Sequence, residues 1–168
     1  MCIRDRLTSQ QTIDISSTNG SVTLSDVSAG ADVQVQAANN ITQRSGTEVD
    51  AGTTVNFVAN NGSVNLASLT TGADVQVQAF NNIVQQSGSD IVAATTVNLS
   101  ANNGTVNLGN VSASDDILVQ AANNLTQQST TEVIAGATVD FNSNNGACLL
   151  YTSPSPRDAT LSRMPSSA

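Results

Sequence analysis

The sequence predicts an all-β fold, a parallel β-helix (β-solenoid), from two repeating patterns. Asparagine recurs at a 21-residue interval along most of the chain, and a longer identity returns at a 42-residue interval. The segment "ADVQVQAANNI" from Ala31 returns as "ADVQVQAFNNI" from Ala73, and "TTVNFVANNGSVNL" from Thr53 returns as "TTVNLSANNGTVNL" from Thr95. A fixed period of this length indicates units that each pack against the next. We therefore expect 21-residue coils of two alternating kinds, which together form a 42-residue double repeat.

Within each unit, apolar and polar residues alternate with a period of two. In the clearest segment, Val33, Val35 and Ala37 alternate with Gln34 and Gln36. Such alternation predicts a strand of about five residues with one buried side, and no helical period appears beside it. The residues that we expect to face the core are Val33, Val35, Val55, Phe57, Val64, Leu66, Val75, Val77, Val97, Leu99, Val119 and Phe141.

An antiparallel hairpin meander or a sandwich is the alternative fold. The pair Asn61-Gly62 supports it, because Asn-Gly favours a tight hairpin turn. The other kind of unit has Ile or Leu after its two asparagines, where a hairpin would favour glycine. The chain also holds only three phenylalanines, which suits a narrow coil better than a sandwich core. These features favour the solenoid.

The asparagines at the 21-residue spacing are the candidate structural ladder. We expect them to stack in one column, as amides do in cross-β structures. We expect the glycines that follow some of them, such as Gly20 and Gly62, to occupy turn positions with positive φ. The predicted ladder consists of Asn19, Asn40, Asn61, Asn82, Asn103, Asn124 and Asn145.

The two ends of the sequence differ from the repeats. Residues 148–168 hold all three prolines and the only tyrosine. The stretch "CLLYTSPSPRD" resembles a translation of the transposase mosaic-end adapter used in DNA sequencing libraries, and "MCIRD" resembles a translation of its reverse complement. We therefore expect residues 1–6 and 148–168 to be adapter-derived rather than native, with the second segment disordered. Residues 7–147 are then the solenoid.

Residues 7–147 are strongly acidic. The chain has 13 acidic residues and five arginines; two of those acids and four of those arginines lie in the ends, which leaves 11 acids, Arg44 alone and a formal charge of −10. This balance argues against binding to nucleic acid or to an anionic membrane. No apolar run approaches the ~20 residues of a membrane helix. We expect no direct membrane insertion.

The acids of the repeats are the remaining candidates for chemistry, because residues 7–147 contain no histidine, cysteine or lysine. Nucleophile–base pairs and thiolate metal sites therefore lack their usual residues. Coils about 4.8 Å apart would hold acids of alternate coils about 9.6 Å apart, too far to share a calcium ion. We predict no metal site and no cofactor. The acids recur in two sets, Asp32, Asp74 and Asp116, and Glu48, Asp90 and Glu132.

A polysaccharide lyase is the sharpest enzyme hypothesis for a parallel β-helix, since that chemistry needs a base beside bound acids. Arg44 is the only basic residue of the repeats, and its equivalents in the later double repeats are Gln86 and Gln128. We therefore predict that the chain is not an enzyme and has no catalytic residues.

The units "VQVQAANNI" and "VNLSANNGTVNL" resemble the β-helical repeat region of filamentous haemagglutinin-type exoproteins, which are large secreted adhesins of Gram-negative bacteria, and of autotransporter passengers. The resemblance covers residues 7–147. It implies a right-handed parallel β-helix at the bacterial outer surface or in the extracellular space. It also implies a shaft or adhesion surface, with glycans or proteins of host or neighbouring cells as partners; the binding residues are unknown.

Two other roles remain open. One is a non-catalytic part of a β-helical glycan-active enzyme. The other is an ice-binding-like solenoid, because the pairs Thr53-Thr54 and Thr95-Thr96 recur. Uncovered coil edges also offer unpaired backbone groups to other chains, so we expect end-to-end self-association.

Overall fold

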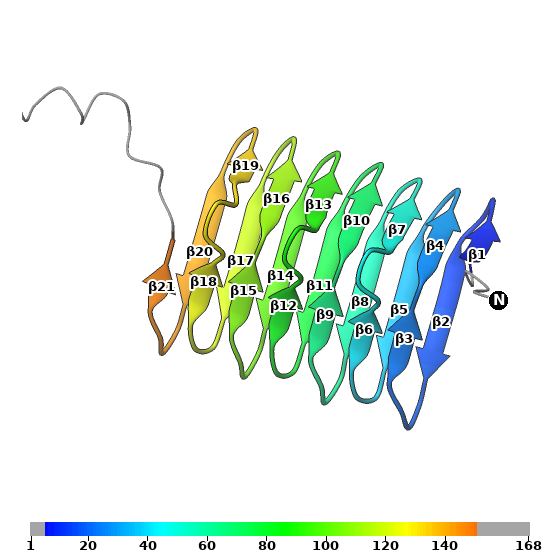
Figure 1. The fold of residues 1–168 in the computed structure, drawn as a ribbon, viewed down its shortest axis with the longest axis horizontal. Coiled ribbons are helices and arrows are strands. Elements are labelled where there is room, and N and C mark those ends of the chain that lie inside the picture. The colour runs from blue at the N-terminus through cyan, green and yellow to red at the C-terminus, as the bar shows by residue number, and fades with distance from the viewer. Residues whose placement is uncertain (1–5, 151–168) are drawn as a thin grey trace, which may run out of the picture.

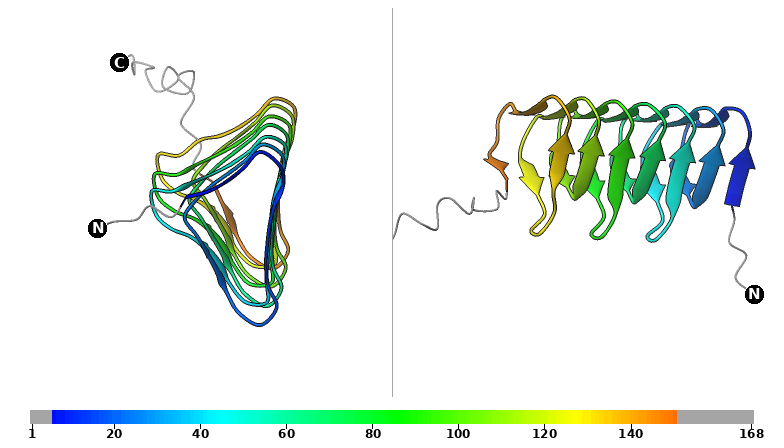
Figure 2. Two further views of the ribbon diagram at one scale, coloured as in Figure 1. Left: turned by 90° about the vertical axis from the view of Figure 1, so that its right-hand side faces the viewer. Right: turned by 90° about the horizontal axis from the view of Figure 1, so that it is seen from above.

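A computed structural model describes residues 6–150 of the chain. These residues form 21 strands in three seven-stranded sheets, with no helix among them. The coils follow one another along the long axis (Figure 1), and the view along that axis shows a triangular outline (Figure 2). The described part of the chain is therefore a β-solenoid of about seven coils, which confirms the predicted fold class over the hairpin meander and the sandwich.

Each coil gives one strand to each sheet, and neighbouring strands within a sheet pair in parallel. Sheet A consists of β1 (Arg6–Ser9), β4 (Asp26–Ala29), β7 (Glu48–Ala51), β10 (Ser68–Thr71), β13 (Asp90–Ala93), β16 (Asn110–Ala113) and β19 (Val133–Ala135). Sheet B consists of β2 (Ile13–Ser17), β5 (Val33–Ala37), β8 (Val55–Ala59), β11 (Val75–Ala79), β14 (Val97–Ala101), β17 (Ile117–Ala121) and β20 (Val139–Ser143). Sheet C consists of β3 (Val22–Leu24), β6 (Ile41–Gln43), β9 (Val64–Leu66), β12 (Ile83–Gln85), β15 (Val106–Leu108), β18 (Leu125–Gln127) and β21 (Cys148–Leu149).

The predicted adapter-derived ends fall mostly outside this description, since residues 1–5 and 151–168 are not described. Two parts of those ends are strand residues. Arg6 begins β1, and Cys148 and Leu149 form β21, which pairs with Leu125 and Thr126 of β18. A parallel ladder is made of backbone groups, so any residue with a free N–H can extend it.

The coils are unequal in length. In sheet B, Val55 lies beside Val33 of the coil before it and beside Val75 of the coil after it, at sequence offsets of 22 and 20. In sheet C, Ile41 lies beside Val22 and Val64, at sequence offsets of 19 and 23. The 21-residue spacing is therefore an average over two coils, and the 42-residue double repeat is the structural unit.

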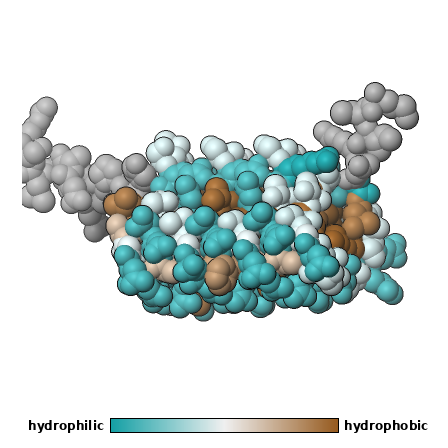
Figure 3. All heavy atoms as spheres, turned by 90° about the horizontal axis from the view of Figure 1, so that it is seen from below, coloured by the Kyte–Doolittle hydropathy of each residue, from teal (hydrophilic) through white to brown (hydrophobic). Residues whose placement is uncertain are grey.

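Most of this difference in coil length lies at the corner between sheets C and A. Four residues, 44–47, connect β6 to β7, whereas Ala67 alone connects β9 to β10. The equivalent loop spans residues 86–89 in the second double repeat and residues 128–132 in the third, where β19 begins one residue later. These loops project from alternate coils along one edge (Figure 2, right), and pale groups rise along the upper edge of the face in Figure 3.

Positive φ occurs in these loops and not at the Asn-Gly corners. Among the described residues it is found at Gly46 (73°), Gly88 (74°) and Thr130 (63°). The expectation of positive φ at Gly20 and Gly62 is therefore wrong. Gly62 is required for a different reason: a Cβ at this position would overlap the backbone carbonyl of Asn39 in the preceding coil.

The core fills the triangle along its length. The predicted core residues are buried, with Phe57 fully enclosed between Val35 and Val77 of the neighbouring coils. Phe141 is the exception, because it lies in the last described strand of sheet B and is only partly buried against the core. Alanines line the end of the sheet B strands, such as Ala59 and Ala79. Small side chains there let the chain turn tightly while the coil interior stays packed.

Candidate functional site

The outer face of sheet A carries two rows of side chains along the solenoid axis. The first, called the acidic row, consists of Glu48, Asp90 and Glu132, which lie on alternate coils, and Asp26 occupies the same position in the coil before Glu48. Ser68 and Asn110 occupy the same position in the coils between them. Members of the row are therefore about 9.6 Å apart, which is two strand spacings.

The second row begins two residues further along the same strands. Its C-terminal half, called the apolar row, consists of Val92 and Ile134, with Ser112 between them. Val92 is 41% exposed and Ile134 is 54% exposed. At the N-terminal end the equivalent residue is Asp50, so only the C-terminal half of this face joins apolar side chains to carboxylates.

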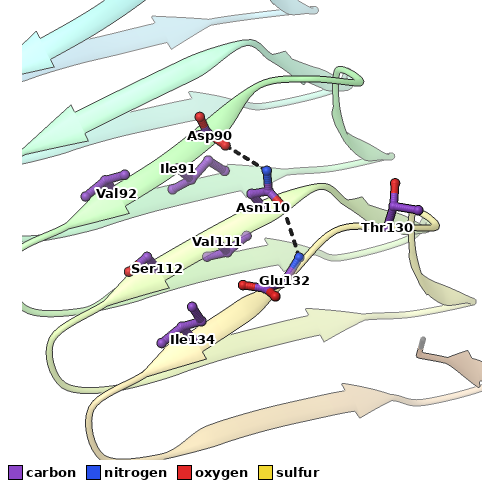
Figure 4. A pocket seen from close by; sticks show the side chains of 9 residues that line it. All are labelled: Asp90, Ile91, Val92, Asn110, Val111, Ser112, Thr130, Glu132 and Ile134. Atoms are coloured by element: carbon purple, nitrogen blue, oxygen red, sulfur yellow. Dashed lines mark hydrogen bonds between the residues drawn. The ribbon is translucent and has the colours of Figure 1, made fainter. Parts of the chain in front are cut away.

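A shallow groove of about 420 Å³ runs between these rows. Asp90, Asn110 and Glu132 lie along one side of it, and Val92, Ser112 and Ile134 along the other (Figure 4). The sheet positions all six side chains on one face because they occupy alternate residues of adjacent parallel strands. Thr130, in the loop between β18 and β19, forms the rim of the groove.

Neutral residues orient two carboxylates of the acidic row, those of Asp90 and Glu48. Asn110 donates from Nδ2 to Oδ1 of Asp90 at 2.8 Å, and its own Oδ1 accepts the backbone N–H of Glu132 at 2.9 Å. In the first double repeat, the Thr70 hydroxyl donates to Oε1 of Glu48 at 2.9 Å. Each contact joins neighbouring coils. The second oxygen of Glu48 and of Asp90 has no hydrogen bond within the described chain, so it is available to a partner.

The other predicted set of acids has a structural environment. Asp32 accepts hydrogen bonds from the Thr53 hydroxyl and from the backbone N–H of Thr54. Asp74 accepts them from the hydroxyls of Thr95 and Thr96. Each aspartate therefore closes the corner of the next coil, much as a helix cap satisfies free N–H groups.

Asp116 repeats this contact with Thr138, accepting from its backbone N–H at 3.0 Å and from its hydroxyl. The three aspartates thus alternate with threonine along one corner. Among the residues that the structure describes, no group of three or more Asp, Glu or Cys side chains converges to hold a metal ion.

Asp74 differs from an ordinary surface carboxyl in its proton affinity. The hydroxyl of Thr95 lowers the pKa of Asp74 below its usual value, and the hydroxyl and N–H of Thr96 act in the same direction. Partial burial opposes them by favouring the neutral acid. Because the hydrogen bonds prevail, the carboxylate is stabilised where it closes the corner.

The seven predicted ladder asparagines lie in two neighbouring columns rather than one. Asn40 lies beside Ser21 and Ser63 in the register of sheet C, and its Oδ1 accepts the Ser63 N–H at 2.8 Å. The unequal coils cause this separation, because an even 21-residue step matches neither the 19- nor the 23-residue offset of sheet C. Asn82 and Asn124 repeat the contact of Asn40, whereas Asn19, Asn61, Asn103 and Asn145 belong to the column before it.

Three buried polar residues at the corner between sheets C and A are glutamines that the sequence patterns do not single out. Gln43, Gln85 and Gln127 are buried at the ends of sheet C strands, where the coils between them have Leu66 and Leu108. Each donates from Nε2 to the carbonyl four residues further along the chain, in the loop that follows its strand. A period of two predicts only that these glutamines lie in strands. Their return beside the loop in each 42-residue double repeat is the one signal that could have indicated that they bond to the loop.

Arg44 and its equivalents lie on the outside of the same corner. Gln86 donates from Nε2 to the backbone carbonyl of Gln43 at 2.7 Å, and Gln128 donates in the same way to Gln85 at 2.6 Å. These side chains therefore bridge two coils across the short corner between them. Arg44 is exposed in the first loop.

No protein-family model, curated protein or solved structure matches this chain. Among the described residues, none forms a helix of the length and hydrophobicity needed to span a membrane. The site is therefore defined by its own geometry: an open groove with the carboxylates of Asp90 and Glu132 on one side and apolar side chains on the other.

Proposed function

We propose that this chain is a structural and adhesive repeat segment of a large secreted or surface-displayed bacterial protein, in which it acts as a shaft or an adhesion surface. The observation that carries the proposal is the unbroken stack of coils. Sheet B pairs in register from Ile13 to Val139 without an inserted segment between any two strands longer than a corner loop. Such a stack is an elongated rod, because each coil contacts only its neighbours and adds to the length along one axis.

The surface chemistry agrees with this role. The corner amides and carboxylates, such as Asn40 and Asp74, bond to the next coil, so they hold the stack rather than a ligand. The resemblance to filamentous haemagglutinin-type exoproteins supports a location at the outer surface or outside the cell. We also propose that residues 1–6 and 148–168 come from adapter DNA, which sequencing of the source gene across both ends would test.

The shaft role can be tested by changing the number of double repeats in the full chain. Deleting residues 55–96 joins Thr54 to Val97. Val97 and Val55 occupy equivalent positions in the register of sheet B, so the remaining coils can stack as before. The end-to-end span should fall by about 9.6 Å, which is two strand spacings. A chain in which a Gly/Ser segment of equal length replaces residues 55–96 is the control, because its span should become broad.

Single-molecule energy transfer between dyes at the two ends would measure these spans. A narrow distribution that shifts with each deleted or duplicated double repeat supports the shaft. If the distribution of end-to-end distances is as broad in the repeat variants as in the Gly/Ser control, the chain is not a rigid spacer.

A further inference from the structure

We propose that the groove on sheet A binds a basic polyproline II segment of a partner protein, with arginine or lysine at every third residue, lying along the solenoid axis. Charge is the first reason. The chain carries a formal net charge of −8, and Asp90 and Glu132 point outward at the groove. A cationic partner is attracted to such a face, whereas an acidic partner is repelled.

The spacing of the carboxylates selects the conformation of the partner. Glu48, Asp90 and Glu132 recur every two coils, a distance of about 9.6 Å. A polyproline II helix has three residues per turn and rises about 3.1 Å per residue, so every third side chain points the same way about 9.3 Å further on. An extended β-strand repeats a face every two residues, about 6.7 Å, and does not match.

The apolar row has the same period as the acidic row. Val92 and Ile134 are two coils apart and lie two residues along the strand from Asp90 and Glu132. A polyproline II helix laid on a surface presents two of its three columns to that surface. One column of basic residues can therefore meet the carboxylates while the next column, if apolar, covers Val92 and Ile134.

The Asp90 carboxylate in the groove is already oriented before a partner arrives, and so is the Glu48 carboxylate further along the acidic row. Asn110 fixes one oxygen of Asp90 and Thr70 fixes one oxygen of Glu48, which leaves the other oxygen of each to accept from an ammonium or guanidinium. Restricting these side chains in advance lowers the entropy lost on binding. A preformed polyproline II segment lowers the same cost on the partner's side.

The test is fluorescence anisotropy of a labelled peptide with the full 168-residue chain at low salt. The matched peptide is four repeats of Arg-Val-Pro. The control peptide has the same composition arranged as two repeats of Arg-Arg-Val-Val-Pro-Pro, which breaks the three-residue period. We expect the matched peptide to bind more tightly, by about two- to fivefold for each well-placed ion pair, and to dissociate as salt rises.

Variants of the chain identify the site. Asp90→Asn and Glu132→Gln should each weaken binding of the matched peptide by about two- to fivefold, and Val92→Ser should weaken it as well. Asp140→Asn is the control, because it removes the same charge from an exposed residue of sheet B and should leave binding unchanged. Circular dichroism of each variant would verify that the β structure is intact.

Three results would overturn the inference: no binding of the matched peptide, equal binding of the two peptides, or an equal loss with Asp140→Asn. The last two would mean that the attraction is only that of the net charge. The inference adds a partner class to the proposed surface role. A rod that fails to bind the peptide can still change its span with repeat number, so the two proposals fail separately.

Discussion

The side chain of Gln85 accepts a hydrogen bond from the backbone N–H of Gly109 at 2.8 Å, inside the corner of the next coil. Its Nε2 also donates to the carbonyls of Ser89 and Asn110, at 2.9 and 2.8 Å. One amide thus closes a four-residue loop and the single-residue corner after it. The unequal coils of the double repeat are joined at this point.

We expect Gln85→Leu to destabilise the fold although leucine occupies the same position in the adjacent coils. The substitution leaves the Gly109 N–H and two carbonyls without partners in a buried corner, at a cost of about 3 kcal/mol or more. Urea denaturation would measure the change. Gln76→Leu, on the exposed face of sheet B, should alter stability by only about 0.5 kcal/mol. Equal effects of the two substitutions would contradict the role of Gln85.

The two phenylalanines of the sheet B interior should differ in their contribution to stability. Phe57 is fully buried, so Phe57→Ala should cost about 3 kcal/mol or more by leaving a cavity. Phe141 is partly exposed in the last described strand of the sheet, and Phe141→Ala should cost clearly less, because the cavity opens to solvent. Denaturation of both variants would compare them directly. A larger loss at Phe141 would mean that further coils cover it.

Gly62 and Gly46 are required for different physical reasons and should respond differently to alanine. In Gly62→Ala the new Cβ overlaps the backbone of the preceding coil, so the two coils must separate locally. In Gly46→Ala nothing lies within 4 Å of the Cβ, and the cost is that of a left-handed conformation, about 1–2 kcal/mol. We expect the larger loss of thermal stability for Gly62→Ala. The reverse order would argue against the close approach of the coils at the Asn-Gly corner.

Asp74 links the stability of the corner to pH. Its pKa in the folded chain lies below that in the unfolded chain, so its contribution is complete above the unfolded value and is lost as pH falls through the folded value. Thr95→Val should raise the pKa of Asp74 towards its ordinary value. Carbon-detected NMR titration of the Asp74 carboxyl would measure it. The variant should be less stable than the parent at pH 7, and the difference should vanish in strong acid; an unshifted titration would contradict the role of Thr95.

The fold class and the core were predictable because they depend on period alone. Val33, Val55 and Val75 face inward for the same reason that Gln34 and Gln76 face outward, which a period of two already contains. The two asparagine columns were not predictable in the same way. Equal spacing in sequence suggests equal coils, whereas the long and short corners shift Asn40 and Asn61 into different columns.

The groove was only partly visible in the sequence. The 42-residue return of Glu48, Asp90 and Glu132 predicts that they lie about 9.6 Å apart once the coils stack. Their combination with Val92 and Ile134 was less evident, because in β13 and β19 an apolar residue stands at the outward position, where most sheet A strands have a polar one. Hydrogen bonds that orient the carboxylates join residues of neighbouring coils, so they follow from the register of the coils and not from any local pattern.

In the stacked-coil structure, the chain rises along one axis by one strand spacing per coil. Pulsed electron paramagnetic resonance can test it with spin labels at Gln36→Cys and Asn142→Cys, in a chain whose Cys2 and Cys148 are replaced by serine. These exposed residues share one column of sheet B through Val58, Gln78, Ser100 and Gln120. They are five coils apart, so we predict a narrow distance distribution centred at about 24 Å, five spacings of about 4.8 Å. A broad distribution, or a maximum far from this value, would contradict the stacked-coil structure.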